Sequence, residues 1–253
     1  MDEFAWFIRA FHELTGIDLA RYKRPQMERR LTNLRDRRGF HDFPSYVQAL
    51  KARRELLDEL LDRMTINVSE FFRNPDRWKQ LVPFLMNKHR PIRAWSAACS
   101  TGEEPYTLAI LLAERNVRHD VILATDIDSR VLELARLGVY EPAQLREIDP
   151  ALRERYFVNE QNRRFHLTES IKRKVEFRNH NLLADPYPEN LDLIICRNVL
   201  IYFTDETKRL LVEKFTESLV PGGVLFVGST EQLLGTQAEA LVSVAPFMYQ
   251  KSK

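Results

Sequence analysis

From residue 90 onward, apolar runs of strand length alternate with segments of helix length, and this alternation limits the possible folds more than any other feature. Such an order is typical of a mostly parallel sheet with helices on both faces. The clearest strand is Leu191–Cys196, in which only Asp192 is polar. The pattern predicts strands at 92–97, 121–125, 175–178, 191–196 and 224–228, helices at 104–114, 130–137 and 205–219, and a turn at 221–223.

The first 64 residues contain only helical periodicity. For example, Phe4, Phe7 and Phe11 recur at the spacing of one helix face. We therefore predict an all-α domain over residues 1–64 and an α/β domain over residues 65–253. Residues 141–174 are too long for a simple connection from helix to strand. Within them, 156–167 has the pattern of a hairpin with a polar turn at 159–162, so we expect a small antiparallel insert.

Composition and charge exclude several classes of protein. The 38 basic and 36 acidic residues give a net charge of +2, which is too balanced for a chain coated with nucleic acid. No run of about 18 apolar residues predicts a membrane-spanning helix, and the acidic start at Met1–Phe4 lacks the features of a secretory signal. Cys99 and Cys196 have neither metal-ligand spacing nor the pattern of a disulfide framework. We expect a cytoplasmic protein without a metal.

The loop after the first predicted α/β strand is built from small residues around Gly102. It is not the G-x-G-x-x-G pattern of dinucleotide-binding proteins, and the helix that follows begins with Glu103 and Glu104. A diphosphate favours a helix N-terminus with positive potential, so two carboxylates there would repel it and would suit a cationic ligand. The alternative is that both glutamates only complement the helix dipole.

An acidic residue also ends the second predicted strand. Asp126 follows Gly102 by 24 residues, a position from which a carboxylate accepts hydrogen bonds from ribose hydroxyls. Asp128 is better explained as a helix N-cap. A nucleoside that lacks a diphosphate and carries a positive group describes S-adenosylmethionine, which we predict as the cofactor.

The third and fourth strands end in further candidates. Asn181 and Leu182 can read and pack an adenine ring, although asparagine is also common in plain turns. Arg197 directly follows the apolar strand 191–196, where a charge has little structural reason to be. We therefore expect Arg197 at the mouth of the sheet.

Four motifs in this order resemble the bacterial chemotaxis receptor methyltransferases, the CheR family, over nearly the whole chain. They are Thr-Ile-Asn-Val-Ser-Glu-Phe-Phe-Arg at 65–73, Ser-Thr-Gly-Glu-Glu-Pro-Tyr at 100–106, Ala-Thr-Asp-Ile-Asp at 124–128 and Arg-Asn-Val-Leu-Ile-Tyr-Phe at 197–203. The resemblance implies a class I, Rossmann-like S-adenosylmethionine-dependent methyltransferase domain behind an all-α domain. It also implies methyl transfer to glutamates on the cytoplasmic helical domain of chemoreceptors, with S-adenosylhomocysteine as product.

The resemblance implies roles for particular residues. The cofactor pocket would be lined by Asn67, Ser69, Arg73, one of Glu103 and Glu104, Asp126, Asn181, Leu182, Arg197 and Asn198. Of the two glutamates we prefer Glu104, and at Ser69 the family often has threonine, which keeps the hydroxyl. Arg73 and Tyr202 would also face the acceptor carboxylate, unless Tyr202 only packs in the core.

The N-terminal domain contains a strongly basic run. Eight basic residues between 21 and 38 face only two acidic ones. We predict that they dock the acidic substrate helices, through Arg21, Arg24, Arg29, Arg30, Arg35, Arg37 and Arg38. A solvated helix face is the plainer alternative, and the run lacks the interleaved aromatic residues that stack on nucleic acid bases.

Three other functions remain open at this point. The protein could be a non-catalytic module that senses S-adenosylmethionine, or a methyltransferase of another signalling protein. A dinucleotide oxidoreductase is disfavoured because the glycine pattern is absent and the paired glutamates are present. We expect a monomer, and the sequence leaves open whether the hairpin insert binds a receptor peptide.

Overall fold

The computed structural model describes residues 2–64, 69–86, 88–161, 163–233 and 240–252. The chain divides into two compact units, which are treated separately below. One comprises Met1–Asn67 with Tyr202–Lys208, and the other comprises Val68–Ile201 with Arg209–Lys253. The sequence did not predict that the short segment Tyr202–Lys208 belongs to the first unit.

The first unit is helical. Its elements are α1 (Glu3–Thr15), the 3-10 turn η1 (Leu19–Arg21), α2 (Arg24–Arg37), α3 (Phe43–Ala52) and α4 (Arg54–Met64). The apolar spacing seen in the sequence gives its core, where Phe7 packs against Phe11 and Phe43. Asp2 and Asp42 cap α1 and α3 by accepting backbone N–H bonds. The segment 202–208 joins this unit through an isolated bridge between Tyr22 and Phe203.

The second unit is α/β. Its helices are α5 (Pro75–Met86), α6 (Glu103–Glu114), α7 (Ser129–Leu137), η2 (Pro142–Leu145), α8 (Pro150–Tyr156) and α9 (Glu169–Lys172). Two further helices, η3 (Leu200–Tyr202) and α10 (Asp205–Ser218), include residues of both units, because 202–208 belong to the first. The strands of the second unit are β1 (Ala94–Ala97), β2 (Ile122–Asp126), β3 (Val139–Tyr140), β4 (Phe157–Glu160), β5 (Arg164–Leu167), β6 (Val175–Asn179), β7 (Leu191–Cys196), β8 (Leu219–Val227), β9 (Leu241–Ala245) and β10 (Met248–Lys251).

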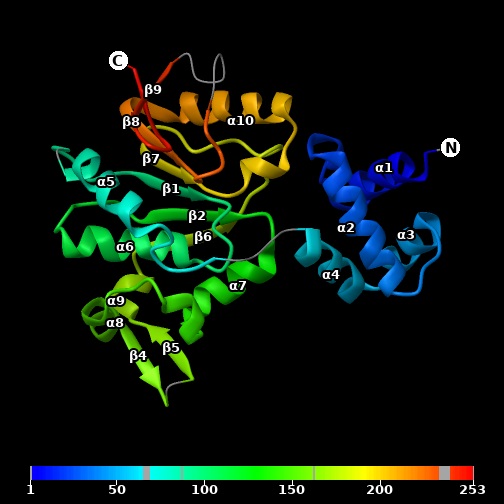
Figure 1. Cartoon of the computed structure of the whole chain (residues 1–253), viewed down its shortest axis with the longest axis horizontal. Helices are drawn as coiled ribbons and strands as arrows, with labels where there is room; N and C mark the ends of the chain where they lie inside the picture. The colour runs from blue at the N-terminus through cyan, green and yellow to red at the C-terminus, as the bar shows by residue number, and fades with distance from the viewer. Residues whose placement is uncertain (1, 65–68, 87, 162, 234–239, 253) are drawn as a thin grey trace. The chain divides into compact units, whose positions relative to one another are not determined.

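Seven of these strands form one sheet in the order β6-β2-β1-β7-β8-β10-β9. Strands β6, β2, β1, β7 and β8 run parallel, which confirms the α/β class predicted from the alternation. Helix α10 covers one face and α6 and α7 cover the other (Figure 1). On the first face Trp95 meets Phe215 of α10, and on the second Phe226 meets Trp78 of α5.

One prediction about this sheet was wrong, and one part of the sheet was not predicted. We expected a turn at 221–223, but this segment lies inside β8, where the pairing with β7 shifts register between Leu191 and Leu193. Gly223 fits because a Cβ there would lie 2.9 Å from the carbonyl oxygen of Leu191. The sequence reading also missed the antiparallel pair β10 and β9 at the sheet edge.

The insert is a separate three-stranded antiparallel sheet in the order β3-β5-β4. The predicted hairpin is present, but Asn159 and Glu160, expected in its turn, are part of β4. Tyr156, expected in the first strand, ends α8. Strand β3, which pairs with β5, was not predicted.

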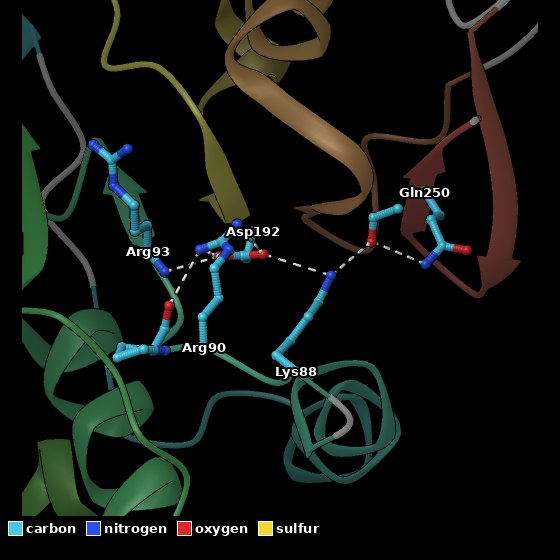
Figure 2. A network of polar contacts seen from close by, with 7 residues as sticks. Lys88, Arg90, Arg93, Asp192 and Gln250 are labelled. Carbon is cyan, nitrogen blue, oxygen red and sulfur yellow. Dashed lines mark hydrogen bonds and ion pairs between the residues drawn. The ribbon is translucent and has the colours of Figure 1, made fainter.

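A polar network ties the amino end of β7 to the segment before β1 (Figure 2). Asp192 is 1% exposed, and both of its oxygens accept from the guanidinium of Arg90 at 2.9 and 3.1 Å. It also accepts from the backbone N–H of Arg93 at 3.0 Å, and its distance to Lys88 Nζ is 3.5 Å. The only polar residue of the predicted strand 191–196 is therefore a buried anchor.

Candidate active site

The strand order places a candidate site at the carboxyl end of β1. From β1 the sheet extends outward through β2 and β6, and the chain then crosses to β7 on the other side of β1. In open α/β sheets, ligands bind at the carboxyl ends of the strands where the order reverses in this way. Residues predicted from the sequence follow each of β1, β2, β6 and β7, so four separate segments of the chain share one edge.

The loop between β1 and α6 has a strained backbone. Ala98, Ser100 and Gly102 all have positive φ, at 62°, 49° and 92°. A Cβ at Gly102 would lie 3.0 Å from Ala135 Cβ and 3.2 Å from the ring of Phe177, so this position requires glycine. The hydroxyl of Ser100 is buried and has no hydrogen-bond partner among the described residues.

Glu103 is fully enclosed by protein groups. Its carboxylate accepts from the Thr101 hydroxyl at 2.7 and 2.8 Å, from the amide of Gln144 in η2, and from the Ser69 hydroxyl. Burial raises the pKa of Glu103, and these hydrogen bonds oppose the rise. Glu103 thus binds the loop to η2, and Ser69 contacts Glu103 directly.

Glu104 lies in a different environment. It accepts from the Ser96 hydroxyl at 2.8 Å, and its Oε2 lies 3.9 Å from Arg197 Nη1. Burial raises the pKa of Glu104 to about 7, although the positive charges of Arg197 and Arg73 oppose the rise. The paired glutamates therefore separate in space, and Glu104 is the one that faces the neighbouring cations.

The sequence predicted Arg197 at the mouth of the sheet. In the structure its side chain lies beneath this edge and is almost fully enclosed. Its side chain is 4% exposed and packs over the ring of Phe226 at 4.8 Å. Nη2 donates to the carbonyl of Arg73 at 3.0 Å and to Asn74 Oδ1 at 2.8 Å, while Nε has no partner among the described residues. Arg197 thus fixes the backbone that carries the Arg73 side chain.

Asp126 ends β2 and is buried. Its two oxygens accept from the backbone N–H groups of Ser100, at 2.8 Å, and Asp128, at 3.0 Å. Burial raises the pKa of Asp126, whereas these two bonds lower it. Each oxygen retains lone-pair capacity for a further donor. Asp128 caps α7 by accepting from Arg130 N, which confirms its predicted N-cap role.

The segments after β6 and β7 complete the edge. Asn181 Oδ1 accepts from the N–H of Leu183, so the turn anticipated as an alternative is formed. Leu182 is buried beside it. Asn198 has a left-handed backbone with φ of 61°, and its N–H donates to Glu231 at 2.7 Å. Sequence reasoning missed Glu231, because its partners Asn198 and Ile201 lie about 30 residues away along the chain.

Other predicted residues lie elsewhere. Asn67 is outside the described residues. Tyr202 belongs to the helical unit, whereas Arg73 belongs to the α/β unit. The guanidinium of Arg30 lies over the Tyr202 ring at 5.8 Å, and Tyr202 is half-buried.

The predicted docking arginines are partly neutralised. Arg24 pairs with Asp2 and Glu28, Arg35 with Asp36 and Glu3, Arg38 with Glu59, and Arg21 with Asp18 and Glu206, while Arg30 donates to the carbonyl of Met64. Arg29 and Arg37 are exposed and have no ion-pair partner among the described residues. With Gln26 and Asn33 they form one exposed stripe of α2, since these positions recur at helical spacing.

Neither a membrane-spanning helix nor a metal-ligand cluster is present among the described residues. No helix in this part of the chain is long and apolar enough to cross a membrane. No group of three or more histidine, cysteine, aspartate or glutamate side chains in it is arranged to hold a metal ion.

Comparison with known proteins agrees with the geometry. The family model described as "CheR methyltransferase, all-alpha domain" matches residues 2–65, and "CheR methyltransferase, SAM binding domain" matches residues 67–246. The chain is 42% identical to the chemotaxis protein methyltransferase of Listeria monocytogenes, covering 99% of this chain and 97% of that protein. It is 35% identical to that of Salmonella typhimurium, covering 87% and 80%.

These matches confirm the predicted resemblance to the CheR family. The match to the SAM binding domain confirms S-adenosylmethionine as the cofactor. The donor set fits such a ligand, because the edge offers carboxylates to a cation and a ribose and lacks a glycine-rich cradle for a diphosphate. With motifs, fold and relatives in agreement, the chain belongs to the CheR methyltransferase family.

Proposed function

We propose that the protein esterifies glutamate side chains on the cytoplasmic helices of chemoreceptors, with S-adenosylmethionine as methyl donor. The observation that carries the proposal is the placement of two carboxylates at the carboxyl edge beside β1: Asp126, which is buried, and Glu104, whose side chain is 12% exposed. The relatives named chemotaxis protein methyltransferases support the signalling context. Such an enzyme is a protein-glutamate O-methyltransferase that works in the cytoplasm.

For methyl transfer, the protein mainly has to align the acceptor carboxylate with the methyl group. The cofactor supplies a sulfonium methyl group: a glutamate oxygen forms a bond to that carbon, the carbon–sulfur bond breaks, and its electron pair stays on sulfur. A glutamate with a pKa of about 4.3 is already ionised near neutral pH, so no general base is needed. Orientation of the reacting groups can lower the barrier by roughly 7–11 kcal/mol.

Particular residues would hold the cofactor. Asp126 would accept hydrogen bonds from the ribose hydroxyls, Asn181 and Leu182 would border the adenine, and Glu104 would face the cationic end. Arg73, Ser69, Asn198 and the enclosed Arg197 complete the pocket, with Asn67 as a further predicted member. Ser100 Oγ and Arg197 Nε support this placement, because both are buried polar atoms without a partner among the described residues.

The substrate assignment is tested by radiolabelled methyl transfer to receptor-containing membranes. We expect label on the receptors that mild base releases as methanol, since esters hydrolyse under such conditions. Arg73→Ala and Tyr202→Phe should both lower turnover, because we propose that these side chains orient the acceptor carboxylate. Binding of S-adenosylhomocysteine without transfer would identify a sensing module, and label on a different signalling protein would replace the receptor as substrate.

Cofactor affinity should rise with pH through the neutral range. Below pH 7 Glu104 is mostly protonated, because its pKa is about 7 in the folded protein. A cation favours the ionised form, so binding at pH 6 must release a proton and is weakened roughly tenfold relative to pH 8. Calorimetry in two buffers of different ionisation enthalpy measures that proton.

The stability of the unliganded protein should move in the opposite direction. A carboxyl whose folded pKa is raised stabilises the fold below its ordinary pKa, and that contribution is lost as pH rises through about 7. Glu104→Gln should remove both pH dependences together. Identical affinity at pH 6 and pH 8, without proton release, would contradict a role for Glu104 at the cofactor.

Receptor docking should depend on the exposed stripe of α2. Arg29→Glu with Arg37→Glu should lower kcat/KM for receptor about tenfold at low salt and weaken its salt dependence. Affinity for S-adenosylhomocysteine should not change. Lys51→Glu with Arg53→Glu, at exposed positions elsewhere in the same unit, is the matched control; an equal loss there would assign the effect to net charge alone.

A further inference from the structure

Glu231 is a buried carboxylate that the methyl-transfer chemistry does not use. It follows β8 by four residues and is 6% exposed. It is not a member of the motifs recognised in the sequence. Because a buried carboxylate is costly unless its oxygens are satisfied, its partners indicate what it is for.

The partners of Glu231 are backbone N–H groups of the two loops that follow β7 and β8. Oε2 accepts from Asn198 N and from Gly228 N, both at 2.7 Å, and Oε1 accepts from Ile201 N at 3.2 Å. The backbone of Val199 also bonds to this carboxylate. One side chain thus binds the start and the end of the 198–201 segment.

The surrounding backbone is shaped around this carboxylate. A Cβ at Gly228 would lie 2.5 Å from Glu231 Oε2 and 2.7 Å from Asn198 N, so only glycine permits the approach. Asn198 adopts a left-handed conformation, which costs free energy unless contacts hold it. Every partner is a donor, so the site needs a group that only accepts, and an ionised carboxylate is such a group. Burial raises the pKa of Glu231, and the four N–H groups oppose that rise.

We propose that Glu231 is a positioning residue, which fixes the 198–201 backbone so that Arg197 and Asn198 stay aligned at the cofactor site. Arg197 in turn holds the carbonyl of Arg73 and the side chain of Asn74. Glu231 is therefore linked to the loop before α5 by hydrogen bonds at Asn198 and at Arg197, which are neighbours in the chain. This role rests on the cofactor site of the proposed function.

The test compares Glu231→Gln with Asp192→Asn. Asp192 is a matched control, because it is a second buried carboxylate that accepts a backbone N–H, at the opposite end of β7. Calorimetric titration with S-adenosylhomocysteine gives a dissociation constant and a stoichiometry for each variant. If Glu231 only stabilises the fold, part of the variant protein is unfolded and the measured stoichiometry falls. The dissociation constant of the folded fraction then remains unchanged.

We expect Glu231→Gln to raise the dissociation constant at least tenfold at a stoichiometry near one, and Asp192→Asn to keep it within twofold. Hydrogen exchange in the unliganded protein should be faster at residues 198–201 in Glu231→Gln only. If Glu231→Gln does not fold, Glu231→Asp retains the charge but is one methylene shorter, and a weakened affinity is again expected.

A wild-type dissociation constant in the folded fraction of the Glu231 variant, or equal weakening in Asp192→Asn, would overturn the positioning role and leave the proposed function intact. Failure of the wild-type protein to bind S-adenosylhomocysteine would overturn both.

Discussion

Asp126→Ala should raise the dissociation constant for S-adenosylhomocysteine by roughly 100-fold or more. Two charge-assisted hydrogen bonds to ribose hydroxyls, at about 1.5 kcal/mol each or above, account for a loss of that size. The same substitution leaves the N–H groups of Ser100 and Asp128 without their acceptor, which disturbs the loop after β1. Isothermal titration calorimetry measures the loss.

The control for this substitution lies two residues along the chain. Asp128→Ala removes the N-cap of α7, so it should lower the free energy of unfolding by about 1 kcal/mol. The dissociation constant should stay within threefold of wild type. Equal affinities in the two variants would show that Asp126 has only a structural part in the loop.

Asp192→Ala should produce the largest loss of stability, about 2–3 kcal/mol. Its carboxylate is buried and takes charge-assisted bonds from Arg90 together with the backbone N–H of Arg93 (Figure 2). Each such bond contributes roughly 1.5–3 kcal/mol. The loss of stability is smaller than the sum of these contributions, because the Arg90 guanidinium can be hydrated once its partner is removed. The midpoint of urea unfolding should fall without a change in slope.

Two further measurements test whether Asp192 acts on stability alone. Lys88→Ala should cost less than about 1 kcal/mol, because the Lys88 contact is long, at 3.5 Å, and the side chain is partly exposed. Asp192→Ala should also retain methyl-transfer activity per folded molecule, since it lies at the amino end of β7. A loss of activity without a loss of stability would mean that the network acts on the site.

Much of the parallel sheet could be predicted because buried strands carry a strong local signal. The strand containing Leu193 has the predicted ends, and the strand containing Ala124 is displaced by one residue at each end. Asp128 could be assigned as a cap for the same reason, since capping joins neighbours in sequence. Helix α5 also has a readable spacing at Trp78, Leu81 and Leu85, and it was overlooked.

What escaped prediction depends on partners far apart in sequence. Glu231 reads as a polar loop residue, and only the fold brings it to Asn198. The same holds for Asp192, whose partner Arg90 is about 100 residues away. Strand β9, at the sheet edge, and its neighbour β10 are short strands that are defined by their pairing and not by their composition. The adjacent side chains of Glu103 and Glu104 point in different directions because of helix geometry, but only the fold brings Gln144 to Glu103.

A crystal structure of the protein with S-adenosylhomocysteine tests the cofactor site most directly. It should place the adenosyl group across the carboxyl ends of β1, β2 and β6, with ribose hydroxyls about 2.6–3.0 Å from the Asp126 carboxylate. The ammonium group should lie beside Glu104. A nucleoside bound at another edge of the sheet, with Asp126 and Glu104 still holding only protein groups, would contradict the assignment.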